Sequence, residues 1–427
     1  MKVLVLGSGG REHALCWKIR QSPLVTELYC APGNPGIAEI CDPVPIPADE
    51  IHQLADFAAE LKIDLTVVGP ELPLTLGIVD EFASRGLPIF GPRQQAAELE
   101  GSKVFAKEFM RRHGIPTAEF EVAHDREQAA AAAKRFGLPV VLKADGLAAG
   151  KGVVIVEDAQ QLDEALDLFF EARRFGAAGD RVVVEERLLG EEISFLAISD
   201  GSHAVPLATS KDYKRLRDGD EGPNTGGMGA HSPAGILRQG LAGQILEKIV
   251  WPTIAGLAEE NRTFRGVLYV GLMLTNDGPK VLEYNVRLGD PEAQALVLRL
   301  EDDLVPVLQQ SAAGRFGSIR LRFRKEASAC LVLAAAGYPA SPEKGDPIEG
   351  LADAAALDGV EVFHAGTAVR DGKLVVAGGR VLNVCAHGPT LRDALRLAYS
   401  AANRVRWPGR QIRTDIGRRV LEQIQQA

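Results

Sequence analysis

The chain has 427 residues, of which 46% are hydrophobic and 25% charged, and its formal charge is -9. This length favours two to four domains, and the composition is that of an ordinary globular protein. The negative charge and the lack of a long Lys/Arg block argue against a nucleic-acid-binding surface, so any anionic ligand must be met by local positive groups.

The cysteines and the apolar segments indicate the compartment. The five cysteines are Cys16, Cys30, Cys41, Cys330 and Cys385. They form no CxxC pair and their number is odd, which favours a reducing compartment over a disulfide framework and gives no zinc-site pattern. The apolar start, residues 1–6, is too short for a signal peptide, and no later run approaches a membrane span. We therefore expect a cytoplasmic protein.

Residues 1–101 alternate short apolar strands with helical segments. The predicted strands lie at 3–6, 65–68 and 88–90, and the predicted helices at 11–20 and 51–61. This alternation is typical of a parallel, doubly wound sheet. We therefore predict an amino-terminal domain of that type.

The first strand leads into Gly-Ser-Gly-Gly-Arg-Glu at residues 7–12, where a helix begins. Backbone amides and the helix dipole attract phosphate at such a position. The sixth residue is Glu12 rather than glycine, and no acidic residue for a ribose follows the second strand, so a dinucleotide is not expected. A smaller phosphorylated ligand fits better, with Asn34 and Glu71 from neighbouring loops. A strand-helix turn that uses glycine only for packing explains the same motif.

A second domain, of mixed α+β pattern, is predicted over residues 102–325. Ser102 is expected to cap a helix that ends near Arg112, and an alanine-rich helix is expected between Asp125 and Gly137. The later elements predicted here are a helix from Ala159 and strands at 181–186 and 267–274.

The glycine-rich stretch LPVVLKADGLAAGKGVVIV lies in this second domain. A P-loop needs four residues between its glycines and Ser or Thr after its lysine, but three residues separate Gly146 from Gly150 and Gly152 follows Lys151. The β-branched run 153–156 predicts a strand, whereas a P-loop opens into a helix. This strand-loop-strand element is either a flap over a polyphosphate or an ordinary glycine-rich hairpin.

Residues 281–288, Val-Leu-Glu-Tyr-Asn-Val-Arg-Leu, predict a strand with one polar face. Side chains alternate across a strand, so Glu283, Asn285 and Arg287 are expected on the same side. The apolar side is predicted to carry Leu282, Tyr284, Val286 and Leu288. Carboxylate and amide oxygens suit Mg²⁺ bridging phosphates, and a guanidinium suits a carboxylate or phosphoryl group. A solvated sheet face explains the same pattern, but the charged turn that follows favours a site.

Residues 326–427 predict a third, smaller α+β domain. Its expected elements are strands at 329–333, 373–376 and 380–384 and a helix from Thr390. The whole chain is therefore predicted to be α/β, with a doubly wound amino-terminal sheet followed by two mixed domains.

Four motifs in order along the chain carry a family resemblance. They are Gly-Gly-Arg-Glu-His at 9–13, Lys-Ala-Asp-Gly-Leu-Ala-Ala-Gly-Lys-Gly at 143–152, Pro-Asn-Thr-Gly-Gly-Met-Gly-Ala at 223–230 and Arg-Leu-Gly-Asp-Pro-Glu at 287–292. Over nearly the whole chain they resemble the phosphoribosylamine-glycine ligase family, also called glycinamide ribonucleotide synthetases, of the ATP-grasp superfamily. The family usually has cysteine and phenylalanine where this chain has Val286 and Leu288. We expect only packing changes there.

The resemblance implies a Rossmann-like (biotin carboxylase-like) amino-terminal domain that binds phosphoribosylamine, a central ATP-grasp domain with a glycine-rich flap, and a small carboxy-terminal α+β domain. The implied reaction joins glycine to 5-phosphoribosylamine, with ATP as a substrate and Mg²⁺ or Mn²⁺, through a glycyl phosphate, in de novo purine synthesis. Such chemistry needs positioning and charge neutralisation rather than a protein nucleophile. The partners implied are small molecules, and we expect a monomer.

The resemblance also assigns residues. Those implied to bind ATP are Lys103, Lys143, Gly146, Gly150, Lys151, Gly152, Glu185, Glu186, Leu188 and Glu192. The implied metal ligands are Glu283 and Asn285. Those implied to hold glycine are Asp212, Gly227 and Arg287, and those for phosphoribosylamine are Gly9, Gly10, Arg11, Asn34 and Glu71. The implied catalytic residues are Arg287, Asp212 and Lys143.

Two rival functions stay open at this point. Another ATP-grasp ligase would act on a different acid and amine, which the predicted phosphate pocket and the Asp212/Arg287 pair disfavour. A catalytically inactive nucleotide-binding sensor is disfavoured by the intact Glu283, Asn285 and Lys143. An ADP-release assay with glycine and phosphoribosylamine separates these functions.

Overall fold

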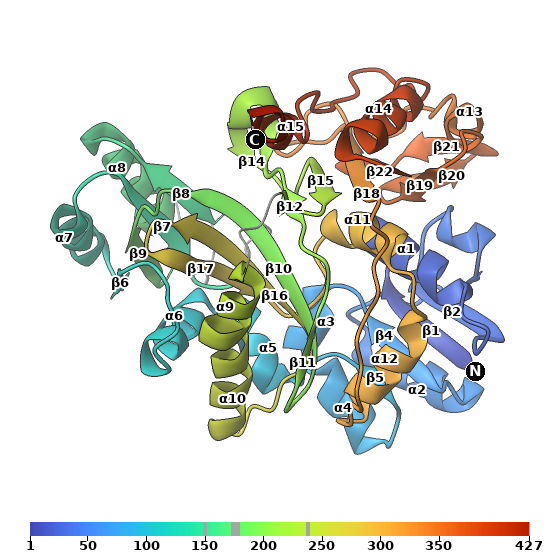
Figure 1. Cartoon of the computed structure of the whole chain (residues 1–427), viewed down its shortest axis with the longest axis horizontal. Coiled ribbons are helices and arrows are strands. Elements are labelled where there is room, and N and C mark those ends of the chain that lie inside the picture. Colours follow the sequence, from blue (N-terminus) through green and yellow to red (C-terminus); the bar gives the residue numbers. More distant parts are fainter. Residues whose placement is uncertain (148–151, 172–179, 236–239, 427) are drawn as a thin grey trace.

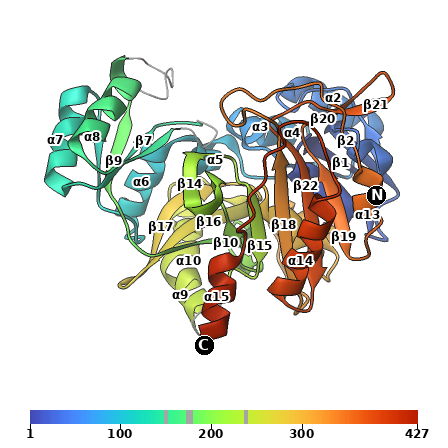
Figure 2. The same ribbon diagram turned by 90° about the horizontal axis from the view of Figure 1, so that it is seen from above.

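The computed structural model describes residues 1–147, 152–171, 180–235 and 240–426 (Figure 1). These residues form a mixed α/β protein in which a parallel sheet is followed by antiparallel and mixed regions, as predicted. Figure 2 shows the lobe that carries α7 and α8 standing apart from the amino-terminal and carboxy-terminal parts of the chain.

Within residues 1–101, the strands form one parallel sheet in the order β3-β2-β1-β4-β5. They are β1 (Lys2–Gly7), β2 (Glu27–Pro32), β3 (Asp42–Pro43), β4 (Leu65–Val68) and β5 (Ile89–Phe90). The helices are α1 (Gly10–Arg20), α2 (Ile51–Leu61), α3 (Glu71–Thr75), α4 (Ile78–Ser84) and α5 (Gln94–Gly101), with the short η1 (Ile37–Glu39). Because all paired strands are parallel, the loops after β1, β2 and β4 meet at one edge. The predicted doubly wound sheet is confirmed.

Two antiparallel sheets follow in the central region. The first has the order β6-β9-β7-β8, with β6 (Phe120–Ala123), β7 (Val140–Ala144), β8 (Val153–Val156) and β9 (Val182–Glu186). The second has the order β11-β10-β16-β17, with β10 (Glu191–Asp200), β11 (Ala204–Pro206), β16 (Arg265–Thr275) and β17 (Gly278–Asn285). The helices here are α6 (Lys103–Arg112), α7 (Arg126–Phe136), α8 (Ala159–Leu166), η2 (Asp167–Glu171), α9 (Leu241–Ile245), η5 (Leu246–Val250) and α10 (Trp251–Glu259). The predicted hairpin is therefore confirmed as β7-β8.

The helix starts in this region follow the predicted caps. Ser102 Oγ accepts a hydrogen bond from the Phe105 amide at 3.0 Å at the start of α6. Asp125 Oδ1 accepts one from the Gln128 amide at 2.8 Å at the start of α7. Side-chain oxygens at these positions satisfy amides that have no partner within the helix, so the sequence alone located both helix starts.

The last sheet joins strands from two parts of the chain, in the order β12-β15-β18-β22-β19. They are β12 (Lys211–Asp212), β15 (Gly229–Ser232), β18 (Ala327–Ala334), β19 (Val360–His364) and β22 (Arg380–Gly388). The remaining elements are β13 (Arg215–Arg217), η4 (Asp218–Asp220), β14 (Glu221–Asn224), α11 (Glu292–Arg299), α12 (Leu304–Ala312), α13 (Leu351–Ala355), β20 (Thr367–Arg370), β21 (Lys373–Val376), α14 (Leu391–Ala402) and α15 (Arg418–Gln426). Because β12 and β15 belong to this sheet, residues 326–427 do not build it alone.

Shared apolar clusters pack these regions against one another. Leu4 and Leu6 of β1 belong to the same buried cluster as Phe195 of β10 and Val270 of β16. A smaller cluster contains residues of α1, α11, β18, β19 and β22. The first cluster also contains Val68, the last residue of β4, and Tyr284 of β17. The packing therefore brings the carboxyl edge of the parallel sheet next to β17. Among the described residues, no helix combines the length and apolar character needed to cross a membrane.

Strand β17 departs from the predicted alternation at Leu282. Its pairing with β16 shifts at this point, so Leu282 is the extra residue of a bulge. Val281, rather than Leu282, joins Val286 in the apolar core. The prediction that Leu282 lies on the apolar face was wrong, because a bulge reverses the alternation of the residues before it. The strand also ends at Asn285, so Arg287 lies in the loop that follows.

Candidate active site

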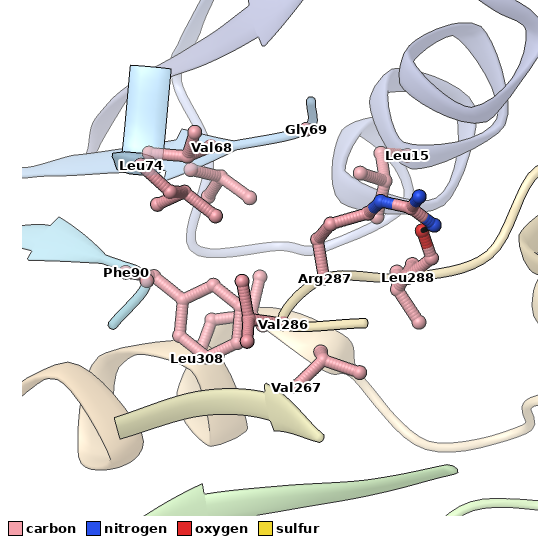
Figure 3. A pocket seen from close by; sticks show the side chains of 12 residues that line it. Leu15, Val68, Gly69, Leu74, Phe90, Val267, Val286, Arg287, Leu288 and Leu308 are labelled. Carbon is pink, nitrogen blue, oxygen red and sulfur yellow. Dashed lines mark hydrogen bonds between the residues drawn. The ribbon is translucent and has the colours of Figure 1, made fainter. Parts of the chain in front are cut away.

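Figure 3 shows a pocket where the amino-terminal sheet meets β16 and the end of β17. Its lining consists of Leu15, Val67, Val68, Gly69, Leu74, Phe90, Gly91, Val267, Val286, Arg287, Leu288 and Leu308. Apart from Arg287, the lining is apolar or glycine, so the pocket is packing space behind the site and does not suit a charged substrate. Leu288, predicted on the same face as Val286, lines the same pocket and packs against the cluster that contains Leu15.

The guanidinium of Arg287 joins the end of β17 to the amino-terminal domain. Its Nε donates to Glu71 Oε2 at 3.1 Å, and its Nη2 donates to Glu100 Oε1 at 2.8 Å and to Asn285 Oδ1 at 3.2 Å. Burial raises the pKa of Glu100, whereas Arg287 and Arg11 overcome burial and lower the pKa of Glu71. Against the effect of burial, the two carboxylates raise the pKa of Arg287. Arg287 therefore carries a permanent charge at the junction.

Glu283 and Lys214 form an ion pair on the polar side of β17. The Lys214 Nζ donates to Glu283 Oε1 at 2.7 Å. This ammonium lowers the pKa of Glu283 to about 2, and Lys143 and Lys103 contribute in the same direction. Glu283 is therefore ionised at neutral pH and lies among positive groups.

Lys103 and Lys143 approach this carboxylate from α6 and β7. Lys103 Nζ donates to the Gly146 carbonyl at 2.9 Å, and Lys143 Nζ donates to the Leu282 carbonyl at 3.0 Å. Burial lowers the pKa of Lys103. The Ala144 amide bonds to the Gly152 carbonyl at 2.8 Å, closing the base of the hairpin. Both predicted lysines therefore lie at the foot of the glycine-rich loop. The predicted residues Gly150 and Lys151 lie outside the described residues.

The predicted adenine and ribose residues follow on β9 and β10. Glu185 lies on β9, and its carboxylate forms ion pairs with Lys107 and Lys143. The Glu186 Oε1 accepts a hydrogen bond from the Glu119 amide at 3.1 Å. Leu188 comes after the end of β9, and Glu192 lies on β10, where it is paired with Met273 of β16.

Asp212 has a buried oxygen, Oδ1, with no hydrogen-bond partner among the described residues. Burial, together with the nearby Glu292, raises the pKa of Asp212. Gly227 has φ +109, and a Cβ there would lie 2.8 Å from Asp212 Oδ1, so glycine is needed at this position. A buried oxygen without a partner is suited to accept from a cationic amino group of a ligand.

Polar groups of the amino-terminal loop, residues 7–12, form hydrogen bonds within the protein. The Gly9 amide donates to Glu12 Oε2 at 2.7 Å, and Arg11 donates to Glu12 Oε1 at 2.6 Å and to the Leu288 carbonyl at 3.0 Å. Glu12, the residue that replaces the third glycine of the dinucleotide motif, therefore bonds back to the Gly9 amide. The amide of Asn34 donates to the carbonyls of Ser8 and His364, at 2.8 and 2.9 Å.

Gly10 lies where the carboxy-terminal part of the chain packs against α1. A Cβ at Gly10 would be 2.1 Å from Asn383 Nδ2 and 2.7 Å from Gln294 Nε2. Nearby, His13 Nδ1 accepts a hydrogen bond from the His364 amide at 2.8 Å, and burial lowers the pKa of His13 to about 3. Gly10 is therefore required for packing, and the neutral His13 adds no positive charge to the loop.

Residues 1–100, 101–293 and 328–419 match family models described as the N domain, the ATP-grasp (A) domain and the C domain of phosphoribosylglycinamide synthetase. The chain belongs to the phosphoribosylglycinamide synthetase family. The matches cover most of the chain, so the family resemblance and the ATP-grasp fold predicted from the four motifs are confirmed.

Relatives of this synthetase family match the chain over its full length. A phosphoribosylamine-glycine ligase of Mesorhizobium japonicum is 49% identical over 417 residues, which covers 98% of each chain. The crystal structure of the phosphoribosylamine-glycine ligase from Thermotoga maritima superposes with a TM-score of 0.84 at 37% identity, over 97% of this chain and 100% of that one. Biotin carboxylase from Campylobacter jejuni shares the fold alone, with a TM-score of 0.72 at 16% identity over 96% and 92%. Because the two phosphoribosylamine-glycine ligases match nearly the whole chain, the protein is a ligase.

The ATP-grasp fold implies ATP as a substrate and a divalent metal ion, and the residues of this synthetase-family chain fit both. Glu283 is an ionised carboxylate, and Asn285 provides an amide oxygen two residues further along. Within the described ranges, no group of three or more His, Cys, Asp or Glu side chains could hold a metal alone. A metal ion held by these two residues would need further oxygen ligands, which suits a hard cation.

Sequence reasoning missed several residues at this site. Lys107 follows Lys103 by one helical turn, a spacing that places both on one face of α6 and could have identified it. Lys214, two residues after Asp212, carried a weaker signal. Glu100 and Asn383 carried none, because their contacts join segments far apart in the sequence.

Proposed function

We propose that this enzyme ligates glycine to 5-phosphoribosylamine, with conversion of ATP to ADP and phosphate, and gives glycinamide ribonucleotide in de novo purine synthesis. The observation that carries the proposal is the arrangement at the end of β17. Glu283 lies among Lys214, Lys143 and Lys103, while Arg287 reaches Glu71 of the amino-terminal domain. In this proposal one short segment, residues 283–287, therefore serves both the nucleotide and the sugar phosphate.

The nucleotide side binds ATP and its metal ion, Mg²⁺ or Mn²⁺. Lys103 and Lys143 neutralise phosphate charge, with Gly146, Gly150, Lys151 and Gly152 as the flap. Glu283 and Asn285 hold the metal ion, which supplies further charge neutralisation when bound. The backbone from Glu185 through Glu186 to Leu188 contacts adenine, and Glu192 contacts the ribose.

Glycine is held between Asp212 and Arg287, beside Gly227. The unpartnered Oδ1 of Asp212 accepts from the amino group of glycine. Arg287 has five N–H groups and makes four hydrogen bonds to the protein, so an N–H remains for the glycine carboxylate. The glycine carboxylate attacks the γ-phosphorus of ATP, and the bond from this phosphorus to the oxygen of ADP breaks, which gives glycyl phosphate and ADP. Arg287 and Lys143 stabilise the charge of that step.

Phosphoribosylamine is held at the carboxyl edge of the parallel sheet, by the loop of Gly9 and Gly10 with Arg11, Asn34 and Glu71. Its amine displaces phosphate from glycyl phosphate, so no protein nucleophile is needed.

We further propose that the chain has three domains, at residues 1–101, 102–325 and 326–427, and that β12 and β15 complete the sheet of the carboxy-terminal domain. We also propose that the protein is monomeric and cytoplasmic.

The test is ADP release with each substrate omitted in turn. We expect ADP only when ATP, glycine and phosphoribosylamine are all present, with glycinamide ribonucleotide as the product detected by mass spectrometry. Release with a different acid or amine in place of these substrates would identify another ATP-grasp ligase. ATP binding without turnover of any such pair would identify a nucleotide sensor.

Replacing Ser8 by aspartate tests the phosphate pocket. Ser8 is exposed in the loop before α1, so a carboxylate fits there without a clash and repels a bound phosphate. We expect the Michaelis constant for phosphoribosylamine to rise about tenfold, while that for ATP stays unchanged. Steady-state kinetics with each substrate varied measure both constants.

Ser8→Asn is the matched control, since asparagine has the shape of aspartate without its charge. We expect it to keep phosphoribosylamine kinetics near those of the unmodified enzyme. Equal losses in the two variants would mean that crowding acts instead of charge, and a loss of ATP affinity as well would place Ser8 outside a separate phosphate pocket.

A further inference from the structure

A buried polar network connects α6 with the edge of β17, and Lys107 begins it. Lys107 Nζ donates to Thr117 Oγ1 at 2.8 Å, and Thr117 Oγ1 donates to the Val281 carbonyl at 2.7 Å. The Val281 amide in turn donates to the Pro116 carbonyl at 2.8 Å. This half of the network therefore fixes the residue just before the bulge of β17.

The other half runs through Glu185. Its Oε2 pairs with Lys107 and its Oε1 with Lys143, and Lys143 also donates to the Leu282 carbonyl at 3.0 Å. The contacts close a ring, because Val281 and Leu282 are adjacent. The carbonyls of Val281 and Leu282 are thus both held by side chains, and the next residue is the proposed metal ligand, Glu283.

The network is almost fully buried, since Lys107 and Glu185 are each 2% exposed and Lys143 is 7% exposed. Burying charges is costly unless each has partners, so such residues are retained where their positions matter. The Lys107 and Lys143 ammonium groups share the Glu185 carboxylate, and the charge of Lys143 also acts on Glu283. A phosphate bound next to Lys143 would be a further negative partner for this ammonium group.

We propose that Lys107 and Glu185 are positioning residues for nucleotide binding. Glu185, held by Lys107, fixes the direction of the Lys143 ammonium, and Thr117 fixes the bulge that directs Glu283. This inference rests on the proposed function, because it requires Lys143 to bind the phosphates of ATP. Lys107 itself touches neither ATP nor the reacting groups and acts through Lys143.

The test is a double-mutant cycle on ATP binding, measured by isothermal titration with Mg²⁺ and without the other substrates. We expect Lys107→Met to raise the ATP dissociation constant about 10- to 100-fold, the usual effect of losing a group that orients a ligand-binding residue. Lys143→Met should weaken binding at least as much, and adding Lys107→Met to it should cause no further loss. An equal loss in both backgrounds would show that Lys107 does not act through Lys143 and overturn the inference.

Two further variants keep the test decisive if Lys107→Met does not fold. Thr117→Val removes one hydroxyl, and we expect a smaller loss of ATP affinity that also disappears in the Lys143→Met background. Lys134→Met, at an exposed lysine of α7, should leave the dissociation constant unchanged. Normal ATP affinity in both Lys107→Met and Thr117→Val would overturn this inference but not the proposed function. An unmodified protein that does not bind ATP would overturn the proposed function as well.

Discussion

Replacing Glu283 by glutamine should lower ligase turnover by about 100-fold or more while the protein stays folded. The Lys214 ammonium keeps the pKa of Glu283 near 2, so the unmodified enzyme has a full negative charge there at neutral pH. Glutamine removes this negative charge from beside Lys214, Lys143 and Lys103. Its amide oxygen still accepts from Lys214, so the melting temperature should change little.

Val286→Cys is the control on the same segment. Val286 is 1% exposed in the core cluster, so cysteine trims the core without changing the polar side of β17. We expect this variant to lose some stability and to keep nearly normal turnover. Metal-dependent ADP release and thermal unfolding measure both effects. A fully active Glu283→Gln enzyme, or a folded but inactive Val286→Cys enzyme, would contradict the assignment of the two faces.

Replacing Arg287 by methionine should abolish turnover and also destabilise the protein, by about 3–5 kcal/mol. The reason is Glu100, whose side chain is 6% exposed and whose carboxylate loses its guanidinium partner. Glu71 lies closer to solvent and should contribute less. Adding Glu100→Gln removes the buried charge, so Arg287→Met/Glu100→Gln should recover much of the stability and none of the activity.

The pH dependence of the Arg287→Met variant gives a second readout. Burial already raises the pKa of Glu100, and without Arg287 that pKa rises further. A carboxyl whose pKa is higher in the folded than in the unfolded state contributes stability that is lost as pH rises through the folded pKa. The single variant should therefore be less destabilised at pH 5 than at pH 8, as measured by urea unfolding. A pH-independent loss would mean that Glu100 is not the cause.

The predictions that succeeded rest on local physics. The apolar strands, the Ser102 and Asp125 caps and the β7-β8 hairpin each depend on a few neighbouring residues, so the sequence identified them without any tertiary information. The common orientation of Asn285 and Arg287 was also predicted correctly, because the two side chains contact each other.

The predictions that failed depend on contacts between distant segments. The bulge at Leu282 is held by Thr117 and Lys143, which lie more than a hundred residues earlier. The bond between the Gly9 amide and Glu12 is local, but it was not predicted because it depends on the side-chain conformation of Glu12, which spacing does not determine. The proposed roles of further site residues, including Lys151, rest on the family resemblance.

The sheet that contains β12 and β15 bears on how this enzyme can be divided. Asp212 lies on β12, and β12 is attached through β15 to β18, the first strand after residue 326. A fragment ending at residue 325 would leave β15 with an open edge, which favours pairing with other chains and aggregation. Exchanging carboxy-terminal regions between relatives would likewise change the support of Asp212. The smallest unit that can be cloned, swapped or evolved separately therefore includes residues 211–232 together with the carboxy-terminal strands.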